Sequence, residues 1–395
     1  LNYLNGILEK NPLSHHARFE KYLSTDEITD RNDFVNTIRQ EMPHETFIEL
    51  AMNYYNLKLN PEALKILELA PRNPMVELWQ AFLMNCEGQK DETQRLLISA
   101  SQASPELVFP FRTEMIPLFS WADSLRPSWK WRYYEALIHW QNHLNDRAGN
   151  LFIACGEEPD FVPFYIAKAR LFNKHPAVVK ASLEKAWEMD PGCWRTGIDL
   201  ARFYAASEEP LKALSIAGKN YKTHPECFVI GLQYAQMQTL NHRYAEALAT
   251  LKGLEMLPAE GDVNAHTLFR QTNILFALDF IKEEKWRKAV YYLNEAEKWP
   301  ENLFSGEPYL ADNRVTHFIT AYCLEKLNKR KEAEAELNYI RDYRNPDGRT
   351  YRSGDILTQL LNTGNRGFKN TLKLVLENLG NDRDKEVLIK FFELL

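Results

Sequence analysis

The chain has 395 residues, of which 45% are hydrophobic and 26% charged, the composition of a protein that folds rather than one that stays disordered. A formal net charge of −6 argues against a nucleic-acid-binding protein, because nonspecific binding to phosphates needs a dense cationic surface. No apolar run approaches the roughly 20 residues that a membrane-spanning helix requires.

The predicted elements are pairs of helices, marked by small residues that recur twelve positions apart. A small side chain on each helix lets two antiparallel backbones approach closely, which is the contact on which helical-hairpin repeats are built. In chain order the pairs are Ala51/Ala63, Ala81/Thr93, Ala136/Ala148, Ala169/Ala181, Ala201/Ala213, Ala235/Ala247, Ala277/Ala289 and Ala321/Ala333. No alternating β-branched run bounded by turn dipeptides is present, so the sequence predicts an all-α fold.

The spacing between pairs gives the repeat length. Second members follow one another at 33, 32 and 34 residues from Ala148 to Ala247, and then at 42 and 44, which predicts longer helices or turns. Prolines that stop a helix recur between the pairs, at Pro74, Pro105, Pro159, Pro191, Pro225, Pro258 and Pro300. A hairpin cannot bury its apolar faces alone, so we expect about eight to ten units stacked into a right-handed superhelical solenoid.

Two segments interrupt the repeats. Residues 104–128 form an insertion that contains Phe109-Pro110-Phe111-Arg112 and then a helix-like stretch from Met115 to Leu125. Residues 341–354 contain Asn-Pro and Asp-Gly turn formers, so we expect a loop there. The expected organisation is a solenoid over 1–340, followed by a loop and C-terminal capping helices over 341–395.

The twelve-residue pairs resemble the tetratricopeptide repeat superfamily. Three strings sharpen the resemblance: Phe109-Pro110-Phe111-Arg112 with Glu114, Tyr133-Tyr134 followed by Trp140, and Trp299-Pro300-Glu301-Asn302-Leu303 with Gly306. Together they look like the C-terminal helical region of large bacterial proteins that carry an uncharacterised β-sandwich domain ahead of the repeats. The resemblance implies a bacterial origin and a missing N-terminal module, and no catalytic residue comes with it; the compartment stays open.

Candidates for chemistry are few. The five cysteines are scattered without a Cys-x-x-Cys pair and sit among apolar residues, so we expect buried free thiols and neither a zinc site nor disulfides. His139 and His143 lie four apart on one predicted helix, but Trp140 occupies the position where a zincin has its glutamate, so we interpret them as surface histidines. No phosphate loop or nucleophile motif is present, and we expect no cofactor, no metal and no catalysis.

Two sets of residues are candidates for binding. The concave face of a tetratricopeptide array is lined by the first helix of each unit, and its register points to Arg195, Arg202, Gln236, Gln271, Phe318 and Tyr322, among the apolar Ile198, Val229, Leu232, Ile274, Leu278 and Val315. A groove of this composition suits an extended peptide or a helix. The insertion supplies the second set: Phe109, Phe111, Arg112, Glu114, Trp131 and Tyr134. The last two belong to a dense aromatic cluster with Trp121, Trp129, Tyr133 and Trp140, whose faces could stack on sugars or simply fill a wide seam.

Three functions remain open at this point. The first is a non-catalytic scaffold that binds a protein, a peptide or its own missing N-terminal domain. The second is an accessory region of a carbohydrate-active or carbohydrate-binding protein, with a glycan site shared with that domain. The third is homo-oligomer assembly through exposed aromatic side chains.

Overall fold

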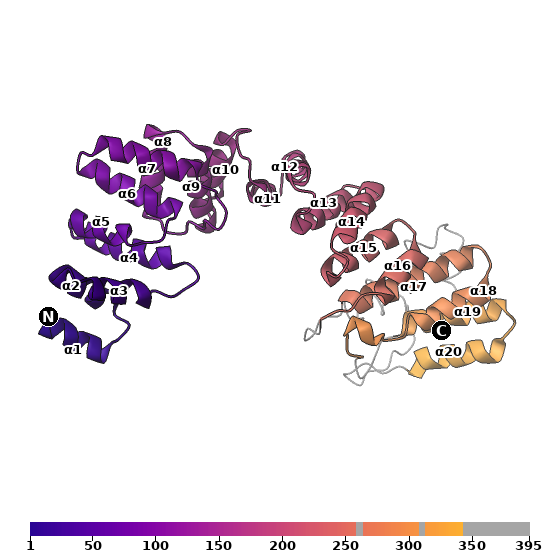
Figure 1. Cartoon of the computed structure of the whole chain (residues 1–395). Helices are drawn as coiled ribbons and strands as arrows, with labels where there is room; N and C mark the ends of the chain where they lie inside the picture. The colour runs from indigo at the N-terminus through magenta and orange to yellow at the C-terminus, as the bar shows by residue number, and fades with distance from the viewer. Residues whose placement is uncertain (258–263, 308–312, 343–395) are drawn as a thin grey trace. The chain divides into compact units, whose positions relative to one another are not determined.

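The structure, a computed structural model, describes residues 1–257, 264–307 and 313–342. These residues form twenty α-helices and one 3-10 helix, and no strand occurs among them, which confirms the all-α prediction (Figure 1). They divide into two compact units, Leu1–Ser182 and Leu183–Leu395. The loop and capping helices predicted for 341–395 lie almost wholly outside the described residues.

Unit 1 contains α1 (Asn2–Lys10), α2 (His15–Thr25), α3 (Ile28–Thr37), α4 (Pro43–Asn56), α5 (Asn60–Glu68), α6 (Pro74–Cys86), α7 (Lys90–Gln102), α8 (Met115–Leu125), α9 (Trp129–Gln141), α10 (Asn145–Ala154) and α11 (Val162–Leu171). Helix α12 (Pro176–Met189) crosses the division between the units. Unit 2 contains α13 (Trp194–Ala206), α14 (Pro210–Thr223), α15 (Phe228–Leu240), α16 (Tyr244–Lys252), α17 (Asn264–Lys282), α18 (Trp286–Glu295), η1 (Glu301–Leu303), α19 (Arg314–Lys326) and α20 (Arg330–Asp342).

Each unit is a stack of helical hairpins. Consecutive helices pair as α2–α3, α4–α5, α6–α7 and α9–α10 in unit 1, and as α13–α14, α15–α16, α17–α18 and α19–α20 in unit 2. Seven of the eight predicted small-residue pairs are buried in this way, from Ala51/Ala63 to Ala321/Ala333. The eighth prediction is wrong in one member: Ala169 is buried but Ala181 is exposed, and its neighbour Ser182 is buried instead. The right-handed superhelical twist stays a prediction.

Most of the hairpins have the same type of turn. In seven of them, three residues separate the helices and the middle one is left-handed, with φ between 56° and 76°; these residues are Lys58, Gly88, His143, Glu208, His242, Glu284 and Asn328. The next backbone N–H reaches back five residues to a carbonyl of the first helix, as in Leu59 N–H to Tyr54 O (2.9 Å) and Lys285 N–H to Phe280 O (2.8 Å). This 6→1 hydrogen bond belongs to the Schellman motif, which satisfies carbonyls left unpaired at a helix end. The twelve-residue spacing therefore consists of seven residues to the turn centre and five beyond it.

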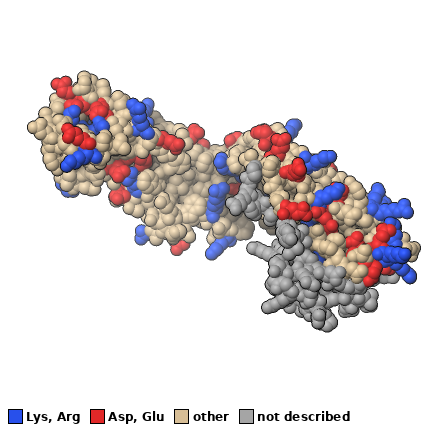
Figure 2. Space-filling view, turned by 90° about the horizontal axis from the view of Figure 1, so that it is seen from below, with Lys and Arg blue, Asp and Glu red and all other residues tan. Residues whose placement is uncertain are grey.

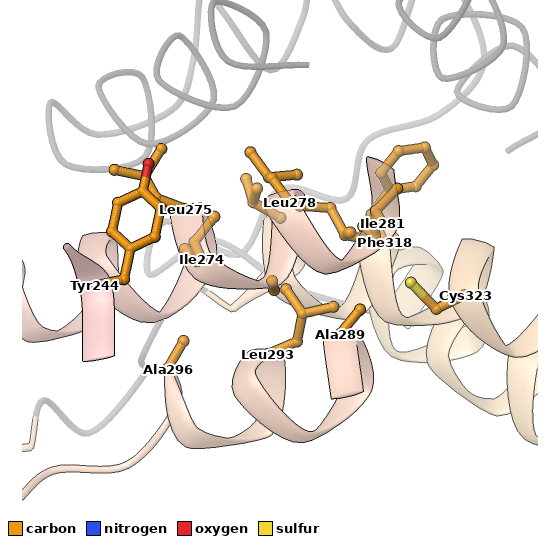
Figure 3. Close-up of a cluster of buried hydrophobic side chains, with 13 residues drawn as sticks. Tyr244, Ile274, Leu275, Leu278, Ile281, Ala289, Leu293, Ala296, Phe318 and Cys323 are labelled. Atoms are coloured by element: carbon orange, nitrogen blue, oxygen red, sulfur yellow. The ribbon is translucent and has the colours of Figure 1, made fainter. Parts of the chain in front are cut away.

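The core of unit 2 shows how the seams are filled. Ile274, Leu275, Leu278 and Ile281 form the apolar stripe of α17, which packs against the second helix of its hairpin and against α19 (Figure 3). Ala289 and Leu293 of α18 face this stripe, and Phe318 and Cys323 of α19 complete the cluster. Burying a side chain such as Leu293 stabilises the fold by about 1.5–3 kcal/mol, and the alanine sets how closely the helices approach.

One of the two lengthened intervals has a visible cause. Helix α17 has 19 residues where α13 and α15 have 13. These six additional residues account for most of the increase from 34 to 42 in the interval that ends at Ala289. The helix-like stretch from Met115 to Leu125 forms α8, as the sequence indicated. The cysteines depart in part from expectation: Cys155 and Cys323 are buried, whereas Cys86 is exposed at the end of α6.

The surface has mixed charge. On the face drawn in Figure 2, Lys and Arg are interspersed with Asp and Glu over the described residues, so neither sign dominates the field there. Among the described helices, none is long and apolar enough to cross a membrane.

Candidate functional site

A pocket of about 680 Å³ lies in unit 2, where α16, α17, α18 and the segment after α18 meet. Its volume is within the range of ligand-binding pockets in proteins. Helix α16 contributes Ala245, Leu248, Ala249, Leu251 and Lys252, α17 contributes Phe269 and Asn273, α18 contributes Tyr291, Tyr292 and Glu295, and the following segment contributes Lys298 to Leu303. The Trp-Pro-Glu-Asn-Leu string singled out in the sequence is thus one wall of the pocket.

Asn302 fastens this wall to α16, which precedes it by about fifty residues. Its side-chain amide donates to the backbone carbonyls of Leu254 (2.8 Å) and Leu251 (3.0 Å), and lies 3.5 Å from that of Lys252. The backbone carbonyl of Asn302 in turn accepts from Met256 N–H at 3.1 Å. The last carbonyls of a helix lack N–H donors within the helix, and here the side-chain amide of Asn302 supplies a donor to them. The pocket wall and the end of α16 are therefore one hydrogen-bonded structure.

Trp299 is held in the wall by His266 of α17. The two rings are stacked, with centroids 3.4 Å apart and planes 9° from parallel. His266 is buried, and burial lowers the pKa of its imidazole to about 4, so the ring is neutral near pH 7. Its Nε2 lies 3.2 Å from the carbonyl oxygen of Lys298, which can only accept, so Nε2 carries the proton. Trp299 lines the pocket while His266 does not, so the indole is supported from outside the cavity.

The pocket joins an apolar interior to a charged rim. Tyr291 and Leu248 supply apolar surface, and Tyr291 is 57% exposed. Lys298 pairs with Glu295 on α18. Lys252 and Glu301 are exposed at the edge, and neither side chain has an ion-pair partner among the described residues. A ligand that combines an apolar group with a charge matches this arrangement.

The predicted concave-face residues divide by position in the chain. Arg195 and Arg202 on α13 and Gln236 on α15 are exposed, and Gln271 on α17 is half-buried. Arg195 lies over its neighbour Trp194, with the guanidinium carbon 4.4 Å from the ring centroid. These residues are accessible, so their role stays a prediction.

Several positions of the predicted register lie in the core, most of them from α17 onward, and Ile198 on α13 is buried as well. Phe318 is 1% exposed and belongs to one buried cluster with Ile274, Leu278 and Val315. Tyr322 is half-buried, with its ring 5.9 Å from that of Trp286. Phe318 therefore does not lie on an open groove, because the seam between successive hairpins uses this face of α19.

The insertion candidates also divide. Trp131 and Tyr134 are fully buried on α9, with ring centroids 6.5 and 5.8 Å from that of Phe119 on α8. Of the two alternatives left open for these rings, stacking on a ligand or filling a seam, the structure shows the second, so they are withdrawn as candidates for binding. Phe109, Phe111 and Glu114 are exposed.

Arg112 is the insertion residue with the longest reach. Its Nε lies 3.3 Å from Glu45 Oε2 and its Nη2 lies 3.6 Å from Glu49 Oε2, both on α4. The ring of Phe111 lies 4.7 Å from the guanidinium carbon. The guanidinium therefore ties the insertion to the second hairpin of unit 1.

The histidine pair does not share a helix. His139 is buried near the end of α9, with Nε2 3.4 Å from Glu135 Oε1, whereas His143 is the left-handed residue of the following turn. No group of three or more metal-ligating side chains occurs among the described residues.

Sequence reasoning missed the pocket itself. The string from Trp299 to Leu303 entered the sequence analysis only as part of a family resemblance. The one sequence signal near the pocket was the lengthened 42-residue interval between Ala247 on α16 and Ala289 on α18. The opposite wall of the pocket, the end of α16, has an ordinary helical sequence that does not mark it as part of a site.

Comparison with known proteins gives only distant likenesses. No family model and no curated protein matches the chain. Among solved structures, the C-terminal part of a TPR repeat-containing protein from Cytophaga hutchinsonii is 14% identical, with 68% of this chain and 98% of that chain covered and a TM-score of 0.37. A tetratricopeptide repeat protein from Parabacteroides merdae is 12% identical, with 74% and 98% covered and a TM-score of 0.32. PilW, a widely conserved type IV pilus biogenesis factor, is 12% identical, with 61% and 96% covered and a TM-score of 0.32.

Proposed function

We propose that the chain is a non-catalytic scaffold of the tetratricopeptide type, and that the pocket of unit 2 receives side chains of a protein partner. The observation that carries this proposal is the pocket between α16, α17 and α18, which joins an apolar interior to rim charges that have no ion-pair partner in the part of the chain that the structure describes. An N-terminal β-rich module, implied by the sequence resemblance, is one such partner.

The pocket has the composition of a peptide-binding site. Apolar and aromatic side chains inside it offer area for burial, at about 25 cal/mol per Å² removed from water. Lys252 and Glu301 at the rim can pair with charges on a partner and so fix its orientation. A volume of about 680 Å³ holds more than one side chain, which fits an amphipathic segment with anchors on one face.

A peptide library displayed on phage tests this function. The chain selects binders, which are then measured against Ala249→Trp, where the new indole fills the pocket. The matched control is Ala206→Trp, another exposed helical alanine of unit 2 that does not line the pocket. We expect at least tenfold weaker binding to Ala249→Trp and unchanged binding to Ala206→Trp.

The opposite results are equally clear. Peptides that bind Ala249→Trp as well as wild type refute the pocket. If these peptides instead lose affinity for the double variant Arg195→Ala/Arg202→Ala, the binding site lies on α13. That result would favour the predicted concave face.

A second candidate is a glycan site, as part of a carbohydrate-binding or carbohydrate-active protein. One observation favours it: the indole of Trp299 lines the pocket and is braced by His266, which makes a rigid aromatic surface of the kind on which sugar rings stack. Soluble glycans should then change the tryptophan fluorescence of wild type but not of Trp299→Phe. Equal or absent changes in the two proteins would reject a glycan at this pocket.

A further inference from the structure

A segment of unit 1 remains that the proposed function does not use: residues 108–112, between α7 and α8, here called the strap. Its burial alternates, because Val108 and Pro110 are buried while their neighbours are not. Alternation with a period of two is that of extended chain, in which successive side chains point to opposite sides. The outward side chains are large and apolar: Phe109 is 57% exposed and Phe111 45%, and Leu107 of the preceding left-handed turn is 68% exposed.

The strap is fixed in place rather than loose. Arg112 pairs with Glu45 and Glu49 of α4, across 67 and 63 residues of sequence. The ring of Phe111 lies against the same guanidinium, and Val108 N–H donates to Pro105 O at 3.3 Å. An extended segment held at both ends has already lost much of the conformational freedom that binding would otherwise remove.

One edge of the strap has unused backbone groups. Neither the N–H nor the carbonyl of Phe109 or Phe111 makes a hydrogen bond to any described residue. In extended chain, residues two apart direct these groups to the same edge. Pro110 lies between them and has no N–H to donate. Proline is found in edge strands for this reason, because one side of an edge strand makes no ladder hydrogen bonds. The strap therefore offers a short, unpaired edge to which another strand can add.

The surroundings of the strap are acidic. Glu106 and Glu114 lie beside it in the chain, and Glu49 of α4 is largely exposed. With Glu45, four carboxylates lie beside the strap or on α4 next to it, against the single guanidinium of Arg112, which pairs with two of them. A second copy of the chain would bring the same carboxylates against them, so like charges oppose pairing of the strap with itself.

We propose that the strap is a docking edge for an extended segment of a partner protein, in which apolar residues alternate and Lys or Arg lie at both ends. The partner's backbone pairs with Phe109 and Phe111, its apolar side chains lie beside the exposed phenylalanines, and its cations face the carboxylates. Strand addition of this kind takes affinity from main-chain hydrogen bonds and selectivity from alternate side chains.

Synthetic peptides test the proposal on the whole chain. The probes are fluorescein-labelled Lys-φ-Thr-φ-Thr-φ-Lys peptides, with φ as Val, Ile, Leu or Phe, measured by fluorescence anisotropy. We expect at least one to bind, with at least fivefold loss of affinity for the double variant Phe109→Ser/Phe111→Ser. The control is Ile153→Ser, which removes an equally exposed apolar side chain of the same unit. Circular dichroism confirms that each variant melts as wild type does.

Three further arms decide the mode of binding. Peptides with Glu in place of Lys, and peptides N-methylated at alternate backbone nitrogens, should bind at least fivefold more weakly. Ala249→Trp should bind the probes normally, so failure of the strap and failure of the unit 2 pocket are distinguishable. No binding by any probe, equal binding by the phenylalanine variant, or dimerisation of wild type that Phe109→Ser/Phe111→Ser abolishes would each overturn the proposal.

Discussion

Asn302→Ala is expected to destabilise unit 2 by releasing the pocket wall from α16. The change removes two well-formed hydrogen bonds, at 2.8 and 3.0 Å, and one weaker contact. A neutral hydrogen bond contributes about 0.5–1.5 kcal/mol, so the free energy of unfolding should fall by about 1–3 kcal/mol. Asn302→Asp is nearly the same size but places a carboxylate among carbonyl oxygens at a helix C-terminus, where the macrodipole adds about 0.3–1 kcal/mol of further repulsion.

Urea unfolding followed by circular dichroism measures both variants. We expect the order wild type, Asn302→Ala, Asn302→Asp in decreasing urea midpoint, and in thermal unfolding a decrease in Tm of about 2–4 °C per kcal/mol for a domain of 150–250 residues. The control is Asn294→Ala on the exposed side of α18, expected within about 0.5 kcal/mol of wild type. Asn302→Asp at or above Asn302→Ala in midpoint would refute the role assigned to the amide donors.

Three other outcomes follow from burial. Ala213→Leu should lower the free energy of unfolding by about 1–3 kcal/mol because its seam has no room, whereas Ala181→Leu, at an exposed position, should leave the urea midpoint unchanged. His266 binds no proton in the folded state between its usual pKa near 6.5 and about 4, so stability falls as pH drops through that window; the urea midpoint of His266→Phe should fall less than that of wild type between pH 7 and pH 5. Burial raises the pKa of Cys155 to about 12, so alkylation of native protein at pH 8 should label the exposed Cys86 and spare Cys155, as read by mass spectrometry.

The hairpins could be predicted from sequence because their contact has a local rule. Two helices that cross closely need a small side chain on each, and the turn fixes the distance between them at twelve residues. The buried pair Ala277/Ala289 obeys this rule in a unit with a lengthened first helix. Ala181 fails it, because a small residue at the right spacing does not by itself require a partner helix.

The faces of the helices could not be predicted in the same way. Which side of α19 is open depends on how it stacks on the preceding hairpin, α17–α18, and that stacking buries Phe318. The same limit applies to Trp131, which is covered by the inserted helix α8 rather than presented to a ligand. The pairing of Arg112 with Glu45 joins residues 67 apart, and no spacing in the sequence marks it.

The turns between paired helices tolerate different residues at their left-handed position. A left-handed residue other than glycine is typically disfavoured by about 1–2 kcal/mol, yet six of the seven turn centres carry a full side chain. The 6→1 backbone bond and the buried seam hold the geometry in spite of this cost, so the turn forms without glycine at six of the seven positions. Residues other than glycine can therefore occupy these turns while the fold persists. Glycine, which adopts the left-handed conformation without that steric cost, is expected to raise the free energy of unfolding at any of the six positions.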